Sequence, residues 1–229
     1  MSESMLLLAI DTCGPTGSVA LGQWDGQAVE ILGQIELEGR NYSSTLVTAA
    51  RNLLAQTNTR LSLLHALVVV NGPGSFTGVR VGLAAVKGLA EAARIPVVAV
   101  SRLEVLAIKT GCLTAVLDAH RHEVYLRLSP LDCLSRELLA GAHELAELSP
   151  SLSRVAVCDE DAALLLTSTS PNAEVIRTAE PTAADALRLC VPRVIAGEFA
   201  DLALLDGHYL RRSDAEIFGE PVAAETARK

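Results

Sequence analysis

A glycine-rich loop between a buried strand and a long helix constrains the fold of this chain more than any other feature of its sequence. Residues 64–70 are apolar and have the composition of a buried strand, and residues 71–78 (NGPGSFTG) form a loop. Residues 79–94 follow with a helical pattern that ends before Pro96, and residues 97–100 form a second apolar strand. A strand, a helix and a strand in this order predict a parallel β-α-β unit, so we expect an α/β protein.

The beginning and the middle of the chain share one plan. Residues 8–11 (LAID) and 115–118 (AVLD) are apolar strands that end in aspartate. Each is followed by a turn and a second strand, at 17–21 and 122–126. This short repeat predicts a duplicated α/β architecture with a boundary near Ser101.

The predicted duplication divides the chain into an N-terminal unit at residues 1–100 and a second, smaller unit at residues 101–195. A segment at about 196–212 is a candidate to return to the N-terminal unit. Residues 213–229 have little apolar periodicity, which predicts a loose tail. Other elements are expected as strands at 29–37 and 155–158 and as helices at 42–56, 103–108, 159–166 and 182–195.

The composition indicates a globular protein and argues against two classes of partner. Half of the 229 residues are hydrophobic and 20% are charged, so the chain can bury a sizeable core. Its net charge of -8 disfavours direct binding to a nucleic-acid backbone. The first apolar stretch lacks a basic leader, and no apolar run approaches the ~20 residues that span a bilayer. The five cysteines are scattered, which is typical of free thiols in a reducing compartment, so we expect a cytoplasmic protein.

Two predicted helices carry more apolar surface than one buried face requires. On the helix at 79–94, the charged residues Arg80, Lys87, Glu91 and Arg94 fall on one narrow stripe, and the other residues are apolar or small. The preceding predicted helix has an apolar face and a weakly polar side with few charges. Either both sides of these helices are buried in their own fold, or one side binds another protein.

Two aspartates end the repeated strands. Asp11 and Asp118 lie where a carboxylate can hold a metal-bound nucleotide or orient a water molecule, but each can instead accept backbone hydrogen bonds in its own turn. The turn after Asp118 contains no glycine that would let a phosphate approach the backbone. The candidate vestigial nucleotide site therefore comprises Asp11, Thr12, Gly17 and Ser18.

Other motifs for chemistry are incomplete. The loop at 72–78 precedes a helix, as phosphate-binding loops do, but it lacks the Gly-Lys-Ser/Thr ending of a P-loop. His120 and His122 form a close pair without a further evident ligand, so no metal site is predicted. No nucleophile motif pairs a Ser or a Cys with a His, and no catalytic residue is assigned.

Several stretches together resemble one protein family. The most specific is the Gly-Pro-Gly-Ser-Phe-Thr-Gly run within residues 71–82, and the resemblance extends over almost the whole chain, to about Arg212. The other matching stretches are 8–12, 87–90, 95–97, 101–106, 118–125 and 209–211. On these residues the chain resembles the TsaB (YeaZ) family.

The resemblance implies a duplicated fold of the actin-like (ASKHA, ribonuclease-H-like) kind and a kinship with TsaD, the catalytic tRNA threonylcarbamoyltransferase. TsaD-like proteins carry a His-x-x-x-His metal motif, and the matching positions here are Arg102 and Leu106. The resemblance therefore implies an inactive paralogue without a metal or cofactor of its own, and it leaves open ATP or ADP at a junction with a partner. Two departures disfavour a nucleotide site further: Cys13 stands where the family commonly has Ser, and His122 where it usually has Gly.

The resemblance also implies a scaffold subunit that binds a TsaD-like protein as a heterodimer and completes a complex with a TsaE-like ATPase. This machinery forms threonylcarbamoyladenosine in tRNAs that read codons beginning with adenine, and this chain would contact tRNA only indirectly. The implied interface comprises Tyr42, Leu46, Val47, Ala50, Leu54, Val79, Leu83, Val86, Lys87 and Ala90. Two alternatives stay open: a homodimer through the same helices, and a weak ATPase or kinase of the same superfamily that uses Asp11 and residues 12–18.

Overall fold

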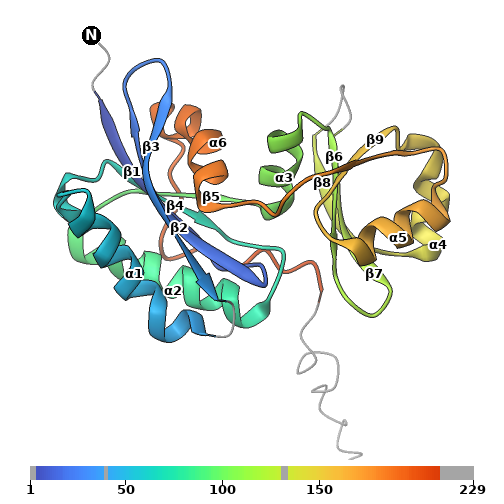
Figure 1. The fold of residues 1–229 in the computed structure, drawn as a ribbon, viewed down its shortest axis with the longest axis horizontal. Coiled ribbons are helices and arrows are strands. Elements are labelled where there is room, and N and C mark those ends of the chain that lie inside the picture. The colour runs from blue at the N-terminus through green and yellow to red at the C-terminus, as the bar shows by residue number, and fades with distance from the viewer. Residues whose placement is uncertain (1–3, 39–40, 130–133, 212–229) are drawn as a thin grey trace, which may run out of the picture.

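Two mixed five-stranded sheets organise the computed structural model, which describes residues 4–38, 41–129 and 134–211 (Figure 1). The first sheet has the strand order β3-β2-β1-β4-β5. Its strands are β1 (Met5–Asp11), β2 (Thr16–Trp24), β3 (Val29–Glu38), β4 (Ala66–Val70) and β5 (Val97–Val100). Because β1 runs parallel to β4, the turn after β1 and the glycine-rich loop after β4 lie at the same edge of the sheet.

The second sheet repeats this arrangement, with the order β8-β7-β6-β9-β10 when read from its antiparallel edge. Its strands are β6 (Thr114–Asp118), β7 (Glu123–Leu128), β8 (Arg136–Gly141), β9 (Arg154–Val157) and β10 (Glu174–Arg177). β6 pairs antiparallel with β7 and parallel with β9, as β1 pairs with β2 and β4. The predicted duplicated α/β architecture is therefore confirmed.

Helices cover both faces of the first sheet. α1 (Tyr42–Gln56) and α2 (Phe76–Ala93) contact each other on one face, and α6 (Ala183–Ile195) lies on the other and contacts all five strands (Figure 1). Val86 of α2 and Leu187 of α6 are fully buried in the hydrophobic core of this unit. The apolar faces of these helices are thus largely used within the fold.

The second sheet also lies between helices. α3 (Arg102–Thr110) contacts β6, β7 and β9, whereas α4 (Ala142–Leu148) and α5 (Glu160–Thr169) pack together on the opposite face (Figure 1). Short 3-10 helices occur at Leu61–Leu63 and Ser149–Ser151. Because α3 also contacts α6, it lies between the two units.

Side-chain oxygens fix where three of the helices begin. Ser75 Oγ accepts a hydrogen bond from Gly78 N at 3.2 Å, so α2 starts three residues before the predicted helix at 79–94. Ser101 Oγ accepts from the Leu103 N–H at 3.2 Å at the start of α3, and Asp159 caps α5. Each cap satisfies a backbone donor that has no partner inside its helix.

The structure differs from the predicted domain division at α6. The predicted second unit at 101–195 includes this helix, but α6 packs on the first sheet, because its Leu187 and Cys190 are buried in that core. Leu205, from the segment expected to return, is buried against the same core. β8, α4 and β10 are elements that the sequence patterns did not predict. The predicted tail at 213–229 falls outside the described residues.

The turn between β6 and β7 holds three consecutive left-handed residues and generates a test of the fold. His120, Arg121 and His122 have φ values of 61°, 57° and 60°. A Cβ costs about 1–2 kcal/mol in this region, and glycine avoids that cost but loses about 0.5–1 kcal/mol through the greater freedom of the unfolded chain. We expect His122→Gly to raise the free energy of unfolding by about 0.5–1 kcal/mol in urea denaturation. His122→Ala keeps the Cβ and is the control, and equal stability of the two variants would contradict the prediction.

Candidate functional site

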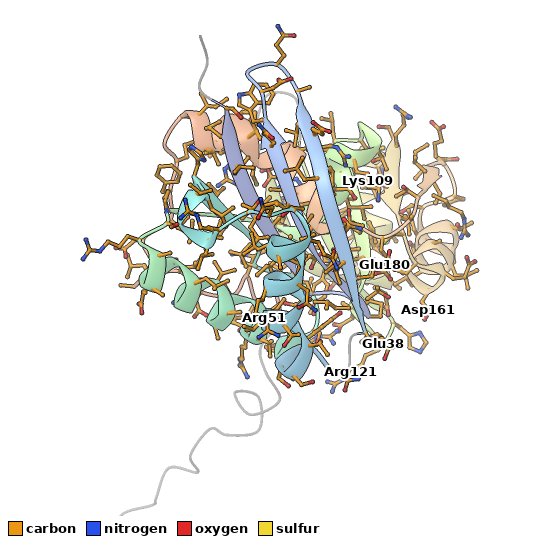
Figure 2. The ribbon with its side chains drawn as sticks, turned by 60° about the vertical axis from the view of Figure 1, so that its left-hand side comes forward. Glu38, Arg51, Lys109, Arg121, Asp161 and Glu180 are labelled. Carbon is orange, nitrogen blue, oxygen red and sulfur yellow. The ribbon has the colours of Figure 1, made fainter. Side chains whose placement is uncertain are left out.

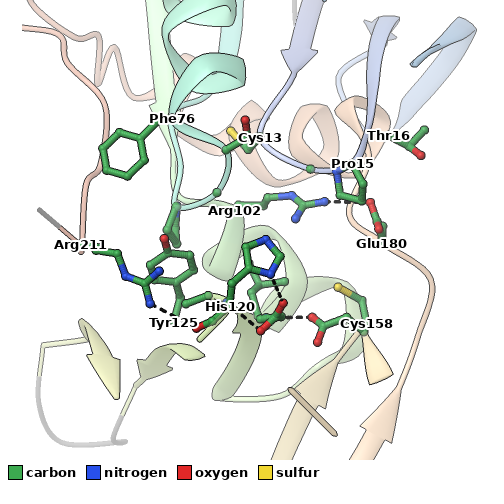
Figure 3. Close-up of a pocket in the computed structure, with 18 of the residues that line it drawn as sticks. Cys13, Pro15, Thr16, Phe76, Arg102, His120, Tyr125, Cys158, Glu180 and Arg211 are labelled. Atoms are coloured by element: carbon green, nitrogen blue, oxygen red, sulfur yellow. Dashed lines mark hydrogen bonds and ion pairs between the residues drawn. The ribbon is translucent and has the colours of Figure 1, made fainter. Parts of the chain in front are cut away.

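A cavity of about 980 Å³ lies between the two sheets (Figure 3). Three connections meet there: the turn after β1, the glycine-rich loop before α2 and the turn after β6. The cavity is lined by Cys13, Gly14, Pro15, Thr16, Glu38, Asn41, Pro73, Gly74, Ser75, Phe76, Arg102, Leu117, Asp118, Ala119, His120, Tyr125, Cys158, Asp159, Glu180 and Arg211. Because both units contribute residues, the cavity is a cleft between them.

A buried ion pair between Asp11 and Arg102 lies at the inner side of the cleft. Arg102 Nε is 3.6 Å from Asp11 Oδ2, and the exposed fractions of the two residues are 5% and 1%. Arg102 Nη2 also donates to Glu180 Oε2 at 3.1 Å, as Figure 3 shows. Among the described residues, Asp11 Oδ2 and Arg102 Nε have no hydrogen-bond partner, so charge rather than hydrogen-bond geometry holds them together.

The protein backbone places Arg102 in this position. Arg102 is the first residue of α3, and its N–H donates to the Gly72 carbonyl oxygen at 2.6 Å. A Cβ added at Gly14 would overlap Arg102 Nη2, so the guanidinium packs directly on the turn after β1. Burial alone would lower the pKa of Arg102, but the surrounding groups, Asp11 foremost, raise it overall, and the side chain stays charged.

Two thiols beside this pair are poor nucleophiles at neutral pH. Burial, with the nearby Asp11 carboxylate, holds the pKa of Cys13 well above its usual value, and its Sγ donates to the Val70 carbonyl oxygen at 3.1 Å. Burial likewise raises the pKa of Cys158 to about 11. A thiolate is the reactive form of cysteine, and neither side chain is poised to supply one.

Asp118 is occupied by contacts within its own turn. Its Oδ1 accepts from the His120 N–H at 2.9 Å, and its Oδ2 lies 2.7 Å from His120 Nδ1. The Asp118 N–H donates to Asp159 Oδ2 at 3.0 Å. These contacts agree with the alternative in which the aspartate accepts hydrogen bonds from its own turn.

The other residues of the candidate nucleotide site make contacts within the first unit and do not line the cleft. Thr12 Oγ1 donates to the Gly78 carbonyl oxygen of α2 at 2.7 Å. Ser18 Oγ accepts from the Ala183 N–H of α6 at 2.8 Å, and Gly17 lies against the ring of Tyr42. Their neighbours at 13–16, rather than these residues, face the cavity.

Most residues of the predicted partner interface are buried in the structure. Seven of its ten residues are buried in the core of the first unit, because the apolar faces of α1 and α2 pack on the sheet. They are Tyr42, Leu46, Ala50, Val79, Leu83, Val86 and Ala90. Of the other three, Val47 is 59% exposed, and Leu54 and Lys87 are partly buried. The outward residues of the helix pair include Ser44, Val47, Thr48 and Arg51 on α1 and Thr77, Arg80, Ala84, Gly88 and Glu91 on α2. Figure 2 labels Arg51 on α1.

Within the described ranges, no group of three or more His, Cys, Asp or Glu side chains could hold a metal ion. Arg102 and Leu106, at the positions of the His-x-x-x-His motif, are both buried. No helix in the described part of the chain is long and apolar enough to cross a membrane.

Sequence reasoning missed the partners of Arg102. Glu180, which binds its guanidinium, is 78 residues away in the connection between β10 and α6. Lys109 of α3 reinforces the same connection by donating to the Glu180 carbonyl oxygen at 2.8 Å (Figure 2). Contacts between segments so distant in the sequence leave no local pattern that could predict them.

The buried ion pair generates a prediction about stability. Arg102→Met leaves Asp11 buried without a counter-charge, and we expect the free energy of unfolding to fall by about 3–5 kcal/mol in urea denaturation. Adding Asp11→Asn removes the unpaired charge, so the double variant should regain part of that loss. Two results would rule out this account of the pair. One is a double variant whose loss of unfolding free energy equals the sum of the two single losses, and the other is a loss below about 1 kcal/mol for Arg102→Met.

Comparisons with known proteins match this chain to a TsaD family model and to TsaB proteins. The family model of TsaD, tRNA N6-adenosine threonylcarbamoyltransferase, matches residues 31–132. The TsaB protein of Bacillus subtilis, a tRNA threonylcarbamoyladenosine biosynthesis protein, is 37% identical over 128 residues, which cover 54% of this chain and 55% of the relative. The TsaB protein of Escherichia coli is 37% identical over 127 residues, with 53% of each chain covered. This chain thus spans about half the length of the curated relatives it matches.

Solved structures match over a larger part of the chain. YeaZ from Pseudomonas aeruginosa has a TM-score of 0.70 and 25% identity, and the match covers 90% of this chain and 100% of that one. A second structure, of an uncharacterized protein with similarity to peptidase YeaZ from Pseudomonas aeruginosa, has a TM-score of 0.67 and 27% identity over the same shares. The chain is thus similar in sequence to curated TsaB proteins over about half its length, and similar in fold to YeaZ over most of it.

Proposed function

We propose that this chain is a non-catalytic scaffold subunit that binds and activates a TsaD-like threonylcarbamoyltransferase in the formation of threonylcarbamoyladenosine in tRNA. The names of its curated relatives and of the matching family model support this pathway. The observation that carries the proposal is the exposed outer side of α1 and α2, where Val47, Ala84 and Gly88 lie among polar and charged residues. The internal packing of the first unit leaves this face exposed.

The outer face of α2 suits close contact with a helix of another protein. Ala84, Gly88 and Ala92 recur every four residues and are exposed, so they lie along one side of the helix. A Cβ added at Gly88 would meet nothing within 4 Å, which shows open space beside it. Small side chains let two helix axes approach, and Val47 on α1 adds the largest exposed aliphatic group of the pair.

This face replaces the buried residues of the predicted interface. A partner helix pair that packs against α1 and α2 would form a bundle, with the outward residues of both helices at its centre. Val47, Leu54 and Lys87 stay in the proposed surface. The buried members, such as Val86, instead support the helices from below.

The cleft supports a non-catalytic role. The guanidinium of Arg102 takes the space beside Asp11 and packs on the turn after β1, where a weak ATPase or kinase would have to hold metal-bound phosphates. Both thiols that line the cleft stay protonated at neutral pH. These contacts favour the scaffold over the enzymatic alternative.

The proposal includes the wider assembly. A TsaE-like ATPase would join the heterodimer, with ATP or ADP at the junction between subunits, and the transferase would hold the tRNA. The net charge of -8 supports this indirect contact with RNA. We place the assembly in the cytoplasm, and we propose that the same helix face forms a homodimer where the partner is absent.

Gly88→Arg tests the interface without threatening the fold. The substitution fills open space on a helix, and arginine is a better helix former than glycine by about 0.8–1 kcal/mol, so the isolated chain should be at least as stable. We expect the wild-type chain and the TsaD-like protein of the same organism to form a 1:1 complex in size-exclusion chromatography with light scattering. Gly88→Arg should weaken that complex by about 30-fold or more, which is the loss of an interface hot spot.

Ile195→Arg is the matched control for this experiment. Ile195 ends α6, on the opposite face of the first sheet, and is also largely exposed. The control should leave the complex intact. If the wild-type proteins do not associate, the proposed function is wrong. If Ile195→Arg disrupts the complex and Gly88→Arg does not, the interface is wrong.

A further inference from the structure

The described chain crosses between the two units three times. The first crossing is at Ser101, between β5 and α3, and the second is the connection from β10 to α6. The third is made by residues 206–211, which we call the strap, and Figure 1 shows it passing from the first sheet toward the second before the described chain ends. We propose that the strap is a positioning device that couples the angle between the two sheets to the N-terminal end of α2.

Backbone contacts join the strap to the end of β4. The His208 N–H donates to the Asn71 carbonyl oxygen at 2.7 Å, and Asn71 Nδ2 donates to the Asp206 carbonyl oxygen at 3.2 Å. Gly72 lets the two backbones approach, because a Cβ there would lie 2.9 Å from the His208 carbonyl oxygen. The φ of 115° at Gly72 is also one that side-chain-bearing residues rarely adopt. The strap is therefore in direct backbone contact with the glycine-rich loop.

Tyr209 joins the strap to the first turns of α2. Its ring stacks on Phe76, with ring centroids 5.0 Å apart and planes 8° from parallel. Arg80 Cζ lies 5.6 Å from each ring centroid, and Arg80 Nε donates to Tyr209 Oη at 3.3 Å. Phe76 and Arg80 belong to the first two turns of α2, so a displacement of Tyr209 acts on that end of the helix.

The side of the strap that faces the second sheet is held by Glu137 of β8. His208 Nε2 lies 2.9 Å from Glu137 Oε2, and the Glu137 side chain is 7% exposed. Glu137 also accepts from Ser101 Oγ at 2.6 Å and from Arg127 Nη1 at 2.7 Å. Burial alone would raise the pKa of Glu137, but these hydrogen bonds lower it overall, which keeps the carboxylate charged.

Glu137 thus binds two of the three crossings at once. Ser101 belongs to the first crossing and His208 to the strap, and both contact one carboxylate of the second sheet. Arg211 adds an ion pair with Glu123 of β7 at the end of the strap.

His208 contacts both units. Its backbone binds the first unit and its imidazole binds the second. A change in the angle between the sheets must therefore strain or break one of these contacts, and Tyr209 is the next residue in the chain. A strap that only held the two units together would leave α2 unaffected when the angle between the sheets changes.

Hydrogen exchange on the full chain alone tests this coupling. Glu137→Gln removes the charge that His208 and Arg127 bind, and within the described residues Glu137 has no hydrogen bond or ion pair with α2. We expect amide exchange in residues 80–84 to rise about tenfold, together with exchange in β8, while α5 stays unchanged. Faster exchange in β8 without a change at 80–84 would overturn the coupling and would show that the strap only holds the two units together.

Two further variants keep the test valid if Glu137→Gln does not fold. His208→Ala removes the same contact from a side chain that is 38% exposed, and it should reproduce the exchange pattern. Tyr209→Ala should raise exchange at 80–84, and Tyr209→Phe, which keeps the stacked ring, should raise it much less. Equal effects of the two Tyr209 variants would show that the stack does not carry the coupling.

The consequence for the partner rests on the proposed function. If α2 binds a TsaD-like protein, Glu137→Gln should weaken that complex by about three- to tenfold, although Glu137 lies in the second unit, away from the outer face of α1 and α2. Failure of the wild-type chain to bind the partner would refute the proposed function, and the exchange result would still decide the coupling. Unchanged partner affinity with faster exchange at 80–84 would overturn the link to the partner.

Discussion

The buried ion pair between Asp11 and Arg102 is the contact on which the arrangement of the two units depends. Asp11 ends the first strand of one unit and Arg102 begins the first helix of the other, so the pair joins the two units. A single charge in this position would be costly to bury, whereas the pair, with Glu180, is balanced. The guanidinium also occupies the side of the turn after β1 that would otherwise open into the cleft.

The contacts in the cleft favour the proposed function, in which the surface of the protein binds a partner. The carboxylates at the ends of β1 and β6 are engaged, by Arg102 and by the turn of His120 respectively. What the first unit leaves unused is the outer side of α1 and α2, where small residues such as Gly88 face open space. A chain whose cleft carboxylates are engaged and whose helix pair is exposed is suited to hold another protein, and the strap gives the second unit a route to act on that helix pair.

Local patterns predicted much of the fold, and long-range packing decided the rest. Strong apolar runs predicted β5 with its correct limits and β6 and β7 to within two residues, and the predicted helix at 42–56 matches α1. β8 and β10 were missed because they are edge strands with few buried residues. Which of the two sheets α6 covers could not be predicted, because the apolar stripe of this helix would fit either sheet. For the same reason composition could not separate the buried face of α2, with Val86, from its open face. Arg102 and Glu180 meet only in the folded chain.

Calorimetric titration of the isolated chain with Mg-ATP tests most directly whether the Asp11–Arg102 ion pair keeps a metal-bound nucleotide out of the cleft. The account predicts no saturable heat of binding up to about 1 mM nucleotide, because Arg102 fills the position beside Asp11 that a metal-bound phosphate needs. A saturable 1:1 isotherm that Asp11→Asn abolishes would contradict it, and would return the function of this protein to the cleft.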